Sequence, residues 1–206
     1  MNIHNVEQGT EDWLKLRAGV PTASEFSKII TSAGKASTQL NTYAAQLAAE
    51  FIAGKPLERW EGNQWTERGK NIEAEAREAY AFDYGVEVAQ VGFVTNHGAG
   101  CSPDGLVGDE GLVEIKCLSP AQHVLVYDFW HRNGGIPADY LPQNRGQMWV
   151  CDRQWNEMFF YYPDPLIPSF RHRIFRDATF DAQLRMQVAK VLAQRDAFVK
   201  TLTEIR

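Results

Sequence analysis

The fold of this chain is decided by residues 100–117, which read GCSPDGLVGDEGLVEIKC. Two runs rich in strand-forming residues, Cys101–Val107 and Leu112–Cys117, flank the short segment Gly108–Gly111. A loop that contains Gly and Asp between such runs is typical of a β-hairpin. We therefore predict a hairpin whose turn is centred on Asp109.

The predicted register brings charged side chains together on one face of the hairpin. It places Asp104 opposite Glu114 and Ser102 opposite Lys116, because the members of each pair are equally far from the turn. Side chains alternate between the faces of a strand, so Asp104, Glu114 and Lys116 share one face. Pro103 leaves a second register open, because Pro inside a strand indicates an edge or a bulge. A one-residue slip there would move Asp104 to the other face.

The opposed carboxylates of Asp104 and Glu114 predict a divalent metal site. Directly opposed Cβ atoms lie about 5 Å apart, and two carboxylates at that distance repel each other unless a cation or a proton lies between them. Mg²⁺, with Mn²⁺ as the alternative, suits such an all-oxygen site; we expect two ions and take the carbonyl of Ile115 as a further ligand. Lys116 would orient or deprotonate an attacking water, which indicates phosphate chemistry.

The order of these residues also carries a resemblance. Pro-Asp, nine residues, then Glu-x-Lys matches the signature of the PD-(D/E)xK nuclease superfamily. The fuller text, CSPDGL followed by EIKC, resembles the phage lambda exonuclease family of recombination nucleases. The resemblance implies an α/β fold with a restriction-endonuclease-like core, in which a central mixed β-sheet carries the hairpin and is flanked by helices.

Length and composition predict one domain. With 206 residues and 44% hydrophobic content, we expect a single nuclease domain over residues 1–206. The sequence shows no secretory signal or long apolar run, so we expect a cytoplasmic protein with no membrane partner. Its three cysteines lack a Cys-x-x-Cys pair. The hairpin register sets Cys101 opposite Cys117, yet free thiols are the better expectation for these two and Cys151.

The net charge of −5 by itself argues against a nucleic-acid partner. The acidic excess, however, falls in residues 78–115, which contain no Lys or Arg and include Asp104 and Glu114. A bound cation would offset that charge, so we expect DNA to be held by a local basic groove.

The N-terminal segment predicts a phosphate site. Thr10 caps a short helix that ends at about Arg17, and after a break at Gly19–Pro21 the hydroxyls of Thr22 and Ser24 open the next helix. Such a helix N-terminus beside a guanidinium can bind a terminal phosphate, although ordinary capping explains the hydroxyls almost as well. WLKLRAG followed by TAS resembles the family's first motif. That resemblance implies that Arg17 and Ser24 hold the 5′-phosphate of DNA.

Two further motifs resemble the family. Residues 68–77, RGKNIEAEAR, resemble its Gly-x-x-x-Glu helix, which implies that Glu73 faces the metals, with Glu75 as its rival. The motif Tyr-x-x-Gln before MWV implies that Gln143 is an active-site residue near the attacking water. The family often has a second Gln where this chain has Arg145, so the role of Arg145 stays open, contact with a backbone phosphate being one alternative.

The rest of the chain predicts alternating helices and strands. Caps and apolar periodicity predict helices over 38–51, 65–84, 119–130, 139–149 and from 177 onward, and strands over 86–95, 157–162 and 171–175. Residues 131–137 indicate a loop. The basic residues of 171–176 are candidates for following a phosphate backbone, and Trp60 and Trp65 for stacking on bases, although Trp is more commonly buried for packing.

The resemblance implies a function in phage-type DNA recombination. It implies 5′-to-3′ digestion of linear double-stranded DNA to mononucleotides, a remaining 3′ single strand, a homotrimeric ring and a single-strand annealing protein as partner. Three alternatives stay open at this point: a restriction or repair endonuclease of the same superfamily, a ring-forming DNA-binding module with a decayed nuclease site, and a Ca²⁺-stabilised structural protein. The last gives no reason for Lys116 beside the metal.

Overall fold

The structure is a computed structural model that describes residues 1–57 and 64–204, with the side chains of 64–71 left aside. Its elements in chain order are β1 (Asn2–His4), α1 (Glu11–Arg17), the 3₁₀ helix η1 (Ala23–Lys28), α2 (Leu40–Ala53), α3 (Gln64–Tyr84), β2 (Val88–Ala89), β3 (Phe93–Asn96), β4 (Ala99–Cys101), β5 (Gly105–Val107), β6 (Gly111–Lys116), α4 (Pro120–Asn133), the 3₁₀ helix η2 (Ala138–Tyr140), α5 (Leu141–Cys151), β7 (Trp155–Phe160), β8 (Phe170–Phe175) and α6 (Ala178–Thr203). None of the helices among the described residues is long and apolar enough to cross a membrane.

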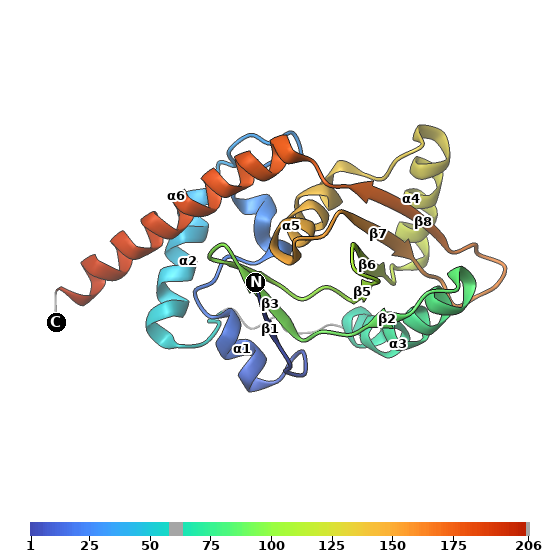
Figure 1. Ribbon diagram of the computed structural model, residues 1–206, viewed down its shortest axis with the longest axis horizontal. Helices are drawn as coiled ribbons and strands as arrows, with labels where there is room; N and C mark the ends of the chain where they lie inside the picture. Colours follow the sequence, from blue (N-terminus) through green and yellow to red (C-terminus); the bar gives the residue numbers. More distant parts are fainter. Residues whose placement is uncertain (58–63, 205–206) are drawn as a thin grey trace.

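A five-stranded mixed sheet lies at the centre of the fold, in the order β2-β5-β6-β7-β8. Strand β6 pairs antiparallel with β5 and parallel with β7, so the hairpin lies inside the sheet. In Figure 1, α3 covers one face of this sheet, while α4 and α5 lie on the other. The expected α/β core with flanking helices is confirmed.

Alternation along β6 separates two hydrophobic clusters. Val113 and Ile115 point toward α3, where they pack with Tyr80 in a smaller cluster. Leu112 points to the opposite face and belongs to the larger cluster, which α5 joins through Met148. Glu114 shares the face of Leu112 by the two-residue period of a strand, so its carboxylate is directed toward α5.

The predicted hairpin register is confirmed where both strands exist. Gly105 pairs with Val113 and Leu106 with Leu112, which is the register that sets Asp104, directly before β5, opposite Glu114. In each pair, the two residues are equally far from the turn. The one-residue slip that Pro103 made conceivable does not occur at these pairs.

The first half of the predicted hairpin strand is wrong. Residues before Asp104 are not part of the central sheet. They form β4, which pairs with β3 in a separate sheet of order β1-β3-β4. Pro103 explains the break, because its nitrogen cannot donate a ladder hydrogen bond. Ser102 therefore does not face Lys116; its hydroxyl donates to the carbonyl of Gly92 at 2.7 Å.

The cysteine pairing implied by that half of the register is wrong as well. The sulfur of Cys101 lies 3.4 Å from that of Cys151, at the end of α5, and both residues are buried in the larger cluster. Cys117 packs at the edge of the smaller cluster. All three are free thiols.

Several other boundaries differ from the sequence expectations. The expected strand over 86–95 is divided between two sheets as β2 and β3. Between them Gly92 lies so close to Val6 that an added Cβ atom would be 1.9 Å from the Val6 carbonyl oxygen. The helix expected after Thr22 is the short 3₁₀ helix η1. Helix α4 continues to Asn133 before Gly134 ends it in the left-handed conformation, so the expected loop over 131–137 begins later.

Candidate active site

The carboxylates of Asp104 and Glu114 meet at the start of the hairpin. Asp104 Oδ2 accepts a 2.6 Å hydrogen bond from the backbone amide of Ile115, which ties the end of the loop to β6. Glu114 is buried, and its Oε1 accepts a 2.7 Å ion-paired hydrogen bond from Lys116 Nζ. The structure thus brings Asp104, Glu114, Ile115 and Lys116 together as the sequence predicts.

Electrostatics in this cluster favour a cation. Burial, followed by the charges of Glu114 and Glu73, raises the pKa of Asp104 well above its ordinary value. Crowded carboxylates of this kind hold a proton unless a positive ion neutralises them. The donor set consists of oxygen atoms, which suits Mg²⁺ or Mn²⁺.

The protonation of Lys116 narrows its role. Burial alone lowers the pKa of this ammonium group, but the charge and hydrogen bond of Glu114 and the charge of Asp104 outweigh burial, so the pKa is raised. A lysine that holds its proton more tightly is a donor. Between the two expected roles, orienting a water fits this geometry better than deprotonating it.

Two glutamines of α5 face the same carboxylate. Gln143 Nε2 donates to Glu114 Oε1 at 2.7 Å, and its own Oε1 accepts from Lys116 Nζ at 3.4 Å. Gln147 Nε2 donates to Glu114 Oε2 at 2.6 Å. The sequence prediction named Gln143 and missed Gln147, although their spacing of four places both on one helix face.

Helix α3 brings Glu73, not Glu75, toward Asp104. Glu73 Oε1 accepts from Arg77 Nη2 at 2.6 Å, and Arg77 Nε donates to the backbone carbonyl of Asp104 at 2.9 Å. Glu75 accepts instead from the hydroxyl of Tyr161 at 2.6 Å, at the end of β7. Arg77, which sequence reasoning assigned no role, therefore links the helix to the candidate metal site.

The side chains do not form a closed three-ligand cage as they stand. Among residues 1–57 and 64–204, no group of three His, Cys, Asp or Glu side chains has the arrangement of a metal site. Glu73 is paired with Arg77, and Glu114 with its amide and ammonium donors. The oxygen donors and the raised pKa of Asp104 nevertheless fit a divalent ion, with Ile115 as the candidate source of a carbonyl ligand.

The second predicted cluster assembles around Arg17, at the end of α1. Arg17 Nη2 donates to Thr22 Oγ1 at 3.4 Å and to Ser24 Oγ at 3.5 Å. Its guanidinium lies over the ring of Trp13, 4.3 Å from the centroid. Burial lowers the pKa of Arg17, and the charges of nearby groups such as Tyr43 and Glu25 oppose that effect. These three polar groups form a compact candidate site for an anion, which is called the anion site below.

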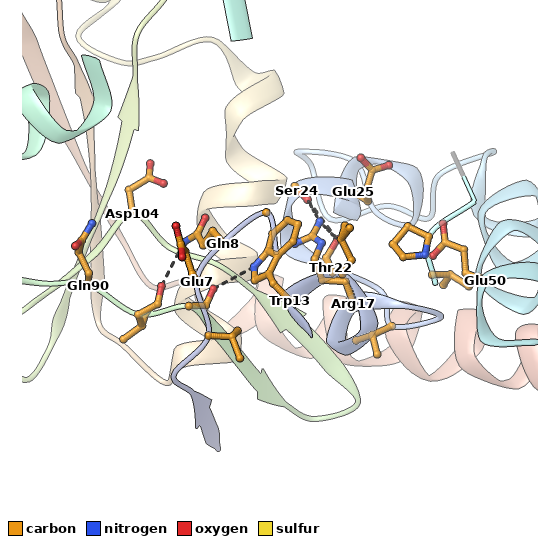
Figure 2. A pocket seen from close by; sticks show the side chains of 18 of the residues that line it. Glu7, Gln8, Trp13, Arg17, Thr22, Ser24, Glu25, Glu50, Gln90 and Asp104 are labelled. Atoms are coloured by element: carbon orange, nitrogen blue, oxygen red, sulfur yellow. Dashed lines mark hydrogen bonds between the residues drawn. The ribbon is translucent and has the colours of Figure 1, made fainter. Parts of the chain in front are cut away.

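Both clusters open into one cavity of about 1100 Å³. Figure 2 shows Arg17, Thr22 and Ser24 in one part of it and Asp104 in another, with Trp13 on the wall between them in this view. The backbone explains the proximity: the amide of Gly100 in β4 donates to the carbonyl of Pro21 at 3.0 Å. Glu73 and Arg77 also line the cavity, whereas Glu114, Lys116 and Gln143 are not among the described residues that line it.

Trp13 connects the two clusters directly. Its indole nitrogen donates to Ser102 Oγ at 2.9 Å, two residues before Asp104, while its ring supports Arg17. Trp13 therefore contacts both Arg17 and the segment between β4 and β5 that carries Asp104.

Other sequence candidates have structural roles. Arg145 is 3.7 Å from the carboxylate of Asp177 and 3.4 Å from the carbonyl of Ser32, away from the metal cluster. Arg171 and Arg173 pair with the buried carboxylate of Glu157, which also accepts from Tyr80. The candidate stacking residues Trp60 and Trp65 lie outside the described side chains.

Arg176 completes the basic cluster expected over 171–176. It pairs with Asp152 and Asp181 at 2.6 Å each. The arginines of this cluster are therefore engaged in ion pairs within the fold, and their contact with a phosphate backbone stays a prediction.

Comparison with known proteins identifies the family of this chain. The model of the YqaJ-like viral recombinase domain matches residues 12–154. The crystal structure of an alkaline exonuclease from Laribacter hongkongensis is similar over 95% of this chain and 97% of that one, at 32% identity and a TM-score of 0.81. The same enzyme in complex with dAMP gives 31% identity and the same TM-score and coverage.

A phage-related exonuclease from Haemophilus somnus shares the fold at 17% identity, with a TM-score of 0.70 over 91% of this chain and 96% of that one. No curated protein matches significantly. The domain match spans more than half of the chain and includes both clusters of the cavity. The chain therefore belongs to the family of the YqaJ-like viral recombinase domain, the lambda-exonuclease-like group of PD-(D/E)xK nucleases.

Proposed function

We propose that the protein is a Mg²⁺-dependent exonuclease that digests one strand of linear double-stranded DNA from its 5′ end. It releases mononucleotides and leaves a 3′ single strand for annealing recombination. The observation that carries the proposal is the shared cavity, which joins an anion site at Arg17 to the carboxylate of Asp104. The complex of the Laribacter exonuclease with dAMP, a mononucleotide, supports the expected product.

The metal-binding groups follow from the cluster at the hairpin. Asp104, Glu114 and the carbonyl of Ile115 would hold Mg²⁺, or Mn²⁺ in its place, and Glu73 would support a second ion. When bound, the metal stabilises negative charge that develops on the scissile phosphate. Lys116 donates hydrogen bonds and so orients the attacking water.

Gln143 supports that arrangement through its two contacts. Its amide nitrogen donates to Glu114, while its oxygen accepts from Lys116. The side chain thereby holds the ammonium group and the carboxylate in a fixed relation. This is a positional role that a glutamine can perform without changing its charge.

The direction of digestion follows from the anion site. A terminal phosphate held by Arg17, Thr22 and Ser24 presents the first nucleotide of the 5′-ended strand to Asp104. The charge-assisted hydrogen bonds of a guanidinium favour a 5′-phosphate over a 5′-hydroxyl. One nucleotide is then released per cleavage.

We further propose a homotrimeric ring around DNA and a single-strand annealing protein as partner. A ring keeps an acidic protein on its substrate because encirclement replaces part of the electrostatic affinity. Static light scattering after gel filtration is expected to give three times the mass of 23.3 kDa. A monomer at micromolar concentration would remove the ring from the proposal.

The proposed activity is tested with linear duplex DNA beside covalently closed circular DNA of the same sequence. We expect Mg²⁺-dependent loss of the linear form, none in EDTA, an intact circle, and no digestion by Glu114→Gln. Cleavage of the circle would show an endonuclease with the same metal site. Absence of cleavage with retained DNA binding would indicate a binding module.

The anion site is tested by comparing 5′-phosphorylated and 5′-hydroxyl ends. Wild type is expected to start faster on the phosphorylated end, by about 10-fold or more if one charged hydrogen bond of roughly 1.5–3 kcal/mol is gained. Arg17→Ala should abolish that preference. A preference that survives in Arg17→Ala would place phosphate recognition elsewhere.

A further inference from the structure

A chain of buried polar side chains lies behind Glu114. Gln147 Nε2 donates to Glu114 Oε2 at 2.6 Å, and Gln147 Oε1 accepts from Asn156 Nδ2 at 2.7 Å. Gln147 is 1% exposed and Asn156 is fully buried. The two residues therefore lie in the core, out of reach of a substrate in the cavity.

The chain is held by elements on three sides. Glu114 is in β6, Gln147 in α5 and Asn156 in β7, which pairs in parallel with β6. Asn156 Nδ2 also lies 3.4 Å from the backbone carbonyl of Asn144 in α5. A shift of the helix or of either strand would break at least one of these hydrogen bonds.

The direction of the hydrogen bonds fixes the orientation of each group. Because Asn156 donates to Gln147 Oε1, the amide nitrogen of Gln147 must face Glu114. That nitrogen donates to Oε2 of Glu114, while Lys116 and Gln143 donate to Oε1. The carboxylate plane is thus fixed from both oxygens.

Burial of these amides calls for an explanation. Moving an amide from water into an apolar core is unfavourable unless the amide is hydrogen-bonded, and a hydrophobic residue of the same size would avoid this cost. The same elements contribute buried apolar side chains to the larger cluster: Met148 and Trp149 of α5 and Met158 of β7 are each at most 1% exposed. Polar residues at 147 and 156 are consistent with a task at Glu114.

We propose that Gln147, oriented by Asn156, is a positioning residue that holds Glu114 ready to ligate the divalent ion. The inference rests on the proposed function, since it takes Glu114 as a metal ligand. Groups that orient a ligand from behind typically change metal affinity 10- to 100-fold when they are removed. Gln147 and Asn156 touch neither substrate nor metal in this account.

The test is binding of Mn²⁺ to the full chain by titration calorimetry, without DNA. Gln147→Met has nearly the volume of the native residue and removes only the amide. We expect it to raise the Kd for Mn²⁺ about 10- to 100-fold. Asn156→Leu, which keeps Gln147 but frees its orientation, is expected to weaken binding in the same direction by a smaller factor.

The chain offers a matched control in Gln187, a second buried glutamine. It is 4% exposed and lies in α6. Gln187→Met makes the same chemical change away from Glu114 and should leave the Kd within twofold of wild type. In a Glu114→Gln background, Gln147→Met should cause no further loss, because a residue that acts through Glu114 has nothing left to position.

The outcomes separate the inference from the proposed function. If wild type binds Mn²⁺ and digests linear DNA while folded Gln147→Met binds as tightly as wild type, the positioning role is overturned and the nuclease assignment stands. If Gln147→Met lacks a cooperative thermal transition, the Kd of Asn156→Leu for Mn²⁺ becomes the test. A Kd equal to that of wild type then overturns the inference. A wild type that neither binds Mn²⁺ nor digests DNA overturns both.

Discussion

Asp104 and Glu114 lie opposite each other but differ in their surroundings. Glu114 is buried and accepts hydrogen bonds from Lys116, Gln143 and Gln147. Asp104 lines the cavity and accepts from a backbone amide. We therefore expect Glu114 to be the fixed ligand and Asp104 the group whose charge depends on the metal.

Replacing Lys116 by Gln tests the role of the ammonium group. The variant keeps a hydrogen-bond donor beside Glu114 and loses the charge, so we expect the digestion rate to fall about 100-fold or more while the fold persists. Initial rates at saturating Mg²⁺ and circular dichroism measure the two effects. Lys15→Gln, which removes an exposed partner of Asp12, should digest at the wild-type rate. A Lys116→Gln variant with wild-type turnover would exclude Lys116 from the reaction.

Asp104 makes the metal-free protein sensitive to alkali. Its folded-state pKa is raised, so the folded chain binds this proton more tightly than the unfolded chain does. The resulting stability is fully present below the unfolded pKa of about 3.9 and is lost as pH rises through the folded-state pKa.

Asp104→Asn should remove that loss. In EDTA we expect the variant to melt above wild type at pH 8, with the difference shrinking toward pH 4; each kcal/mol corresponds to roughly 2–4 °C in a chain of this size. Thermal denaturation across pH measures the difference. Parallel melting curves at all pH values would contradict the assigned pKa shift.

Among single residues, the sequence predicted the positions of those site residues that follow from the alternation of side chains along a strand. Asp104, Glu114 and Lys116 were found because a hairpin fixes which side chains share a face. Gln147 and Arg77 were missed because a polar residue on a helix shows its partners only once the helix is packed. The pairing of Cys101 depended on a strand that Pro103 interrupts.

Helix α5 joins the two clusters of the cavity at the scale of elements. One side of it directs Gln143 and Gln147 toward Glu114. On another side, Gly146 packs against Phe26 of η1, the segment that begins at Thr22 and contains Ser24. The anion site and the metal site are therefore braced by the same helix.

Gly146→Ala tests this contact. A Cβ atom at 146 would lie 2.2 Å from the ring of the fully buried Phe26, so η1 or α5 must move. Overpacking of this kind costs about 1–3 kcal/mol. We expect a lower melting temperature and a weaker preference for 5′-phosphate ends. At Gly135 a Cβ would meet nothing within 4 Å, so Gly135→Ala should behave as wild type, and equal behaviour of both variants would contradict the brace.

Most helices and the central hairpin could be predicted from the sequence. The assignment of the strands to two separate sheets could not. Caps such as Thr10, Ser119 and Asp177 act locally, and the structure shows all three accepting backbone hydrogen bonds. Residues 86–95 are split between two sheets, and at the split Gly92 packs against Val6, a distant contact that no local pattern encodes. The ion pairs of Arg171 and Arg173 with Glu157 were not predicted, because Glu157 lies in the neighbouring strand β7.

At the scale of the whole molecule, the cavity is acidic. Among the described residues its lining includes five carboxylates and three basic groups: Glu7, Glu25, Glu50, Glu73, Asp104, Arg17, Lys28 and Arg77. The cavity is therefore not the local basic groove that the sequence predicts, and its lining gives no net attraction to the phosphates of DNA unless a cation is bound. A divalent ion is thus expected to serve binding as well as chemistry.

Ca²⁺ should separate binding from cleavage. It takes oxygen ligands as Mg²⁺ does but with looser geometry, so we expect it to neutralise the cavity without supporting hydrolysis. Fluorescence anisotropy with a labelled linear duplex should show binding about 10-fold tighter or more in Ca²⁺ than in EDTA, from relief of at least 1.4 kcal/mol of repulsion. Equal affinity in Ca²⁺ and EDTA would contradict this reading of the cavity.

The central claim is that one cavity binds the 5′ end of a DNA strand, and that a metal held at the hairpin serves the cleavage of the adjacent phosphodiester. Its most direct test is hydrolysis followed strand by strand, on a blunt duplex with one 5′-phosphate and a different label in each strand. We predict that Mg²⁺ releases mononucleotides first from the phosphorylated strand, beginning at its 5′ end, and that EDTA or Glu114→Gln prevents release. Release that begins at 3′ ends, or that persists in EDTA, would contradict the account.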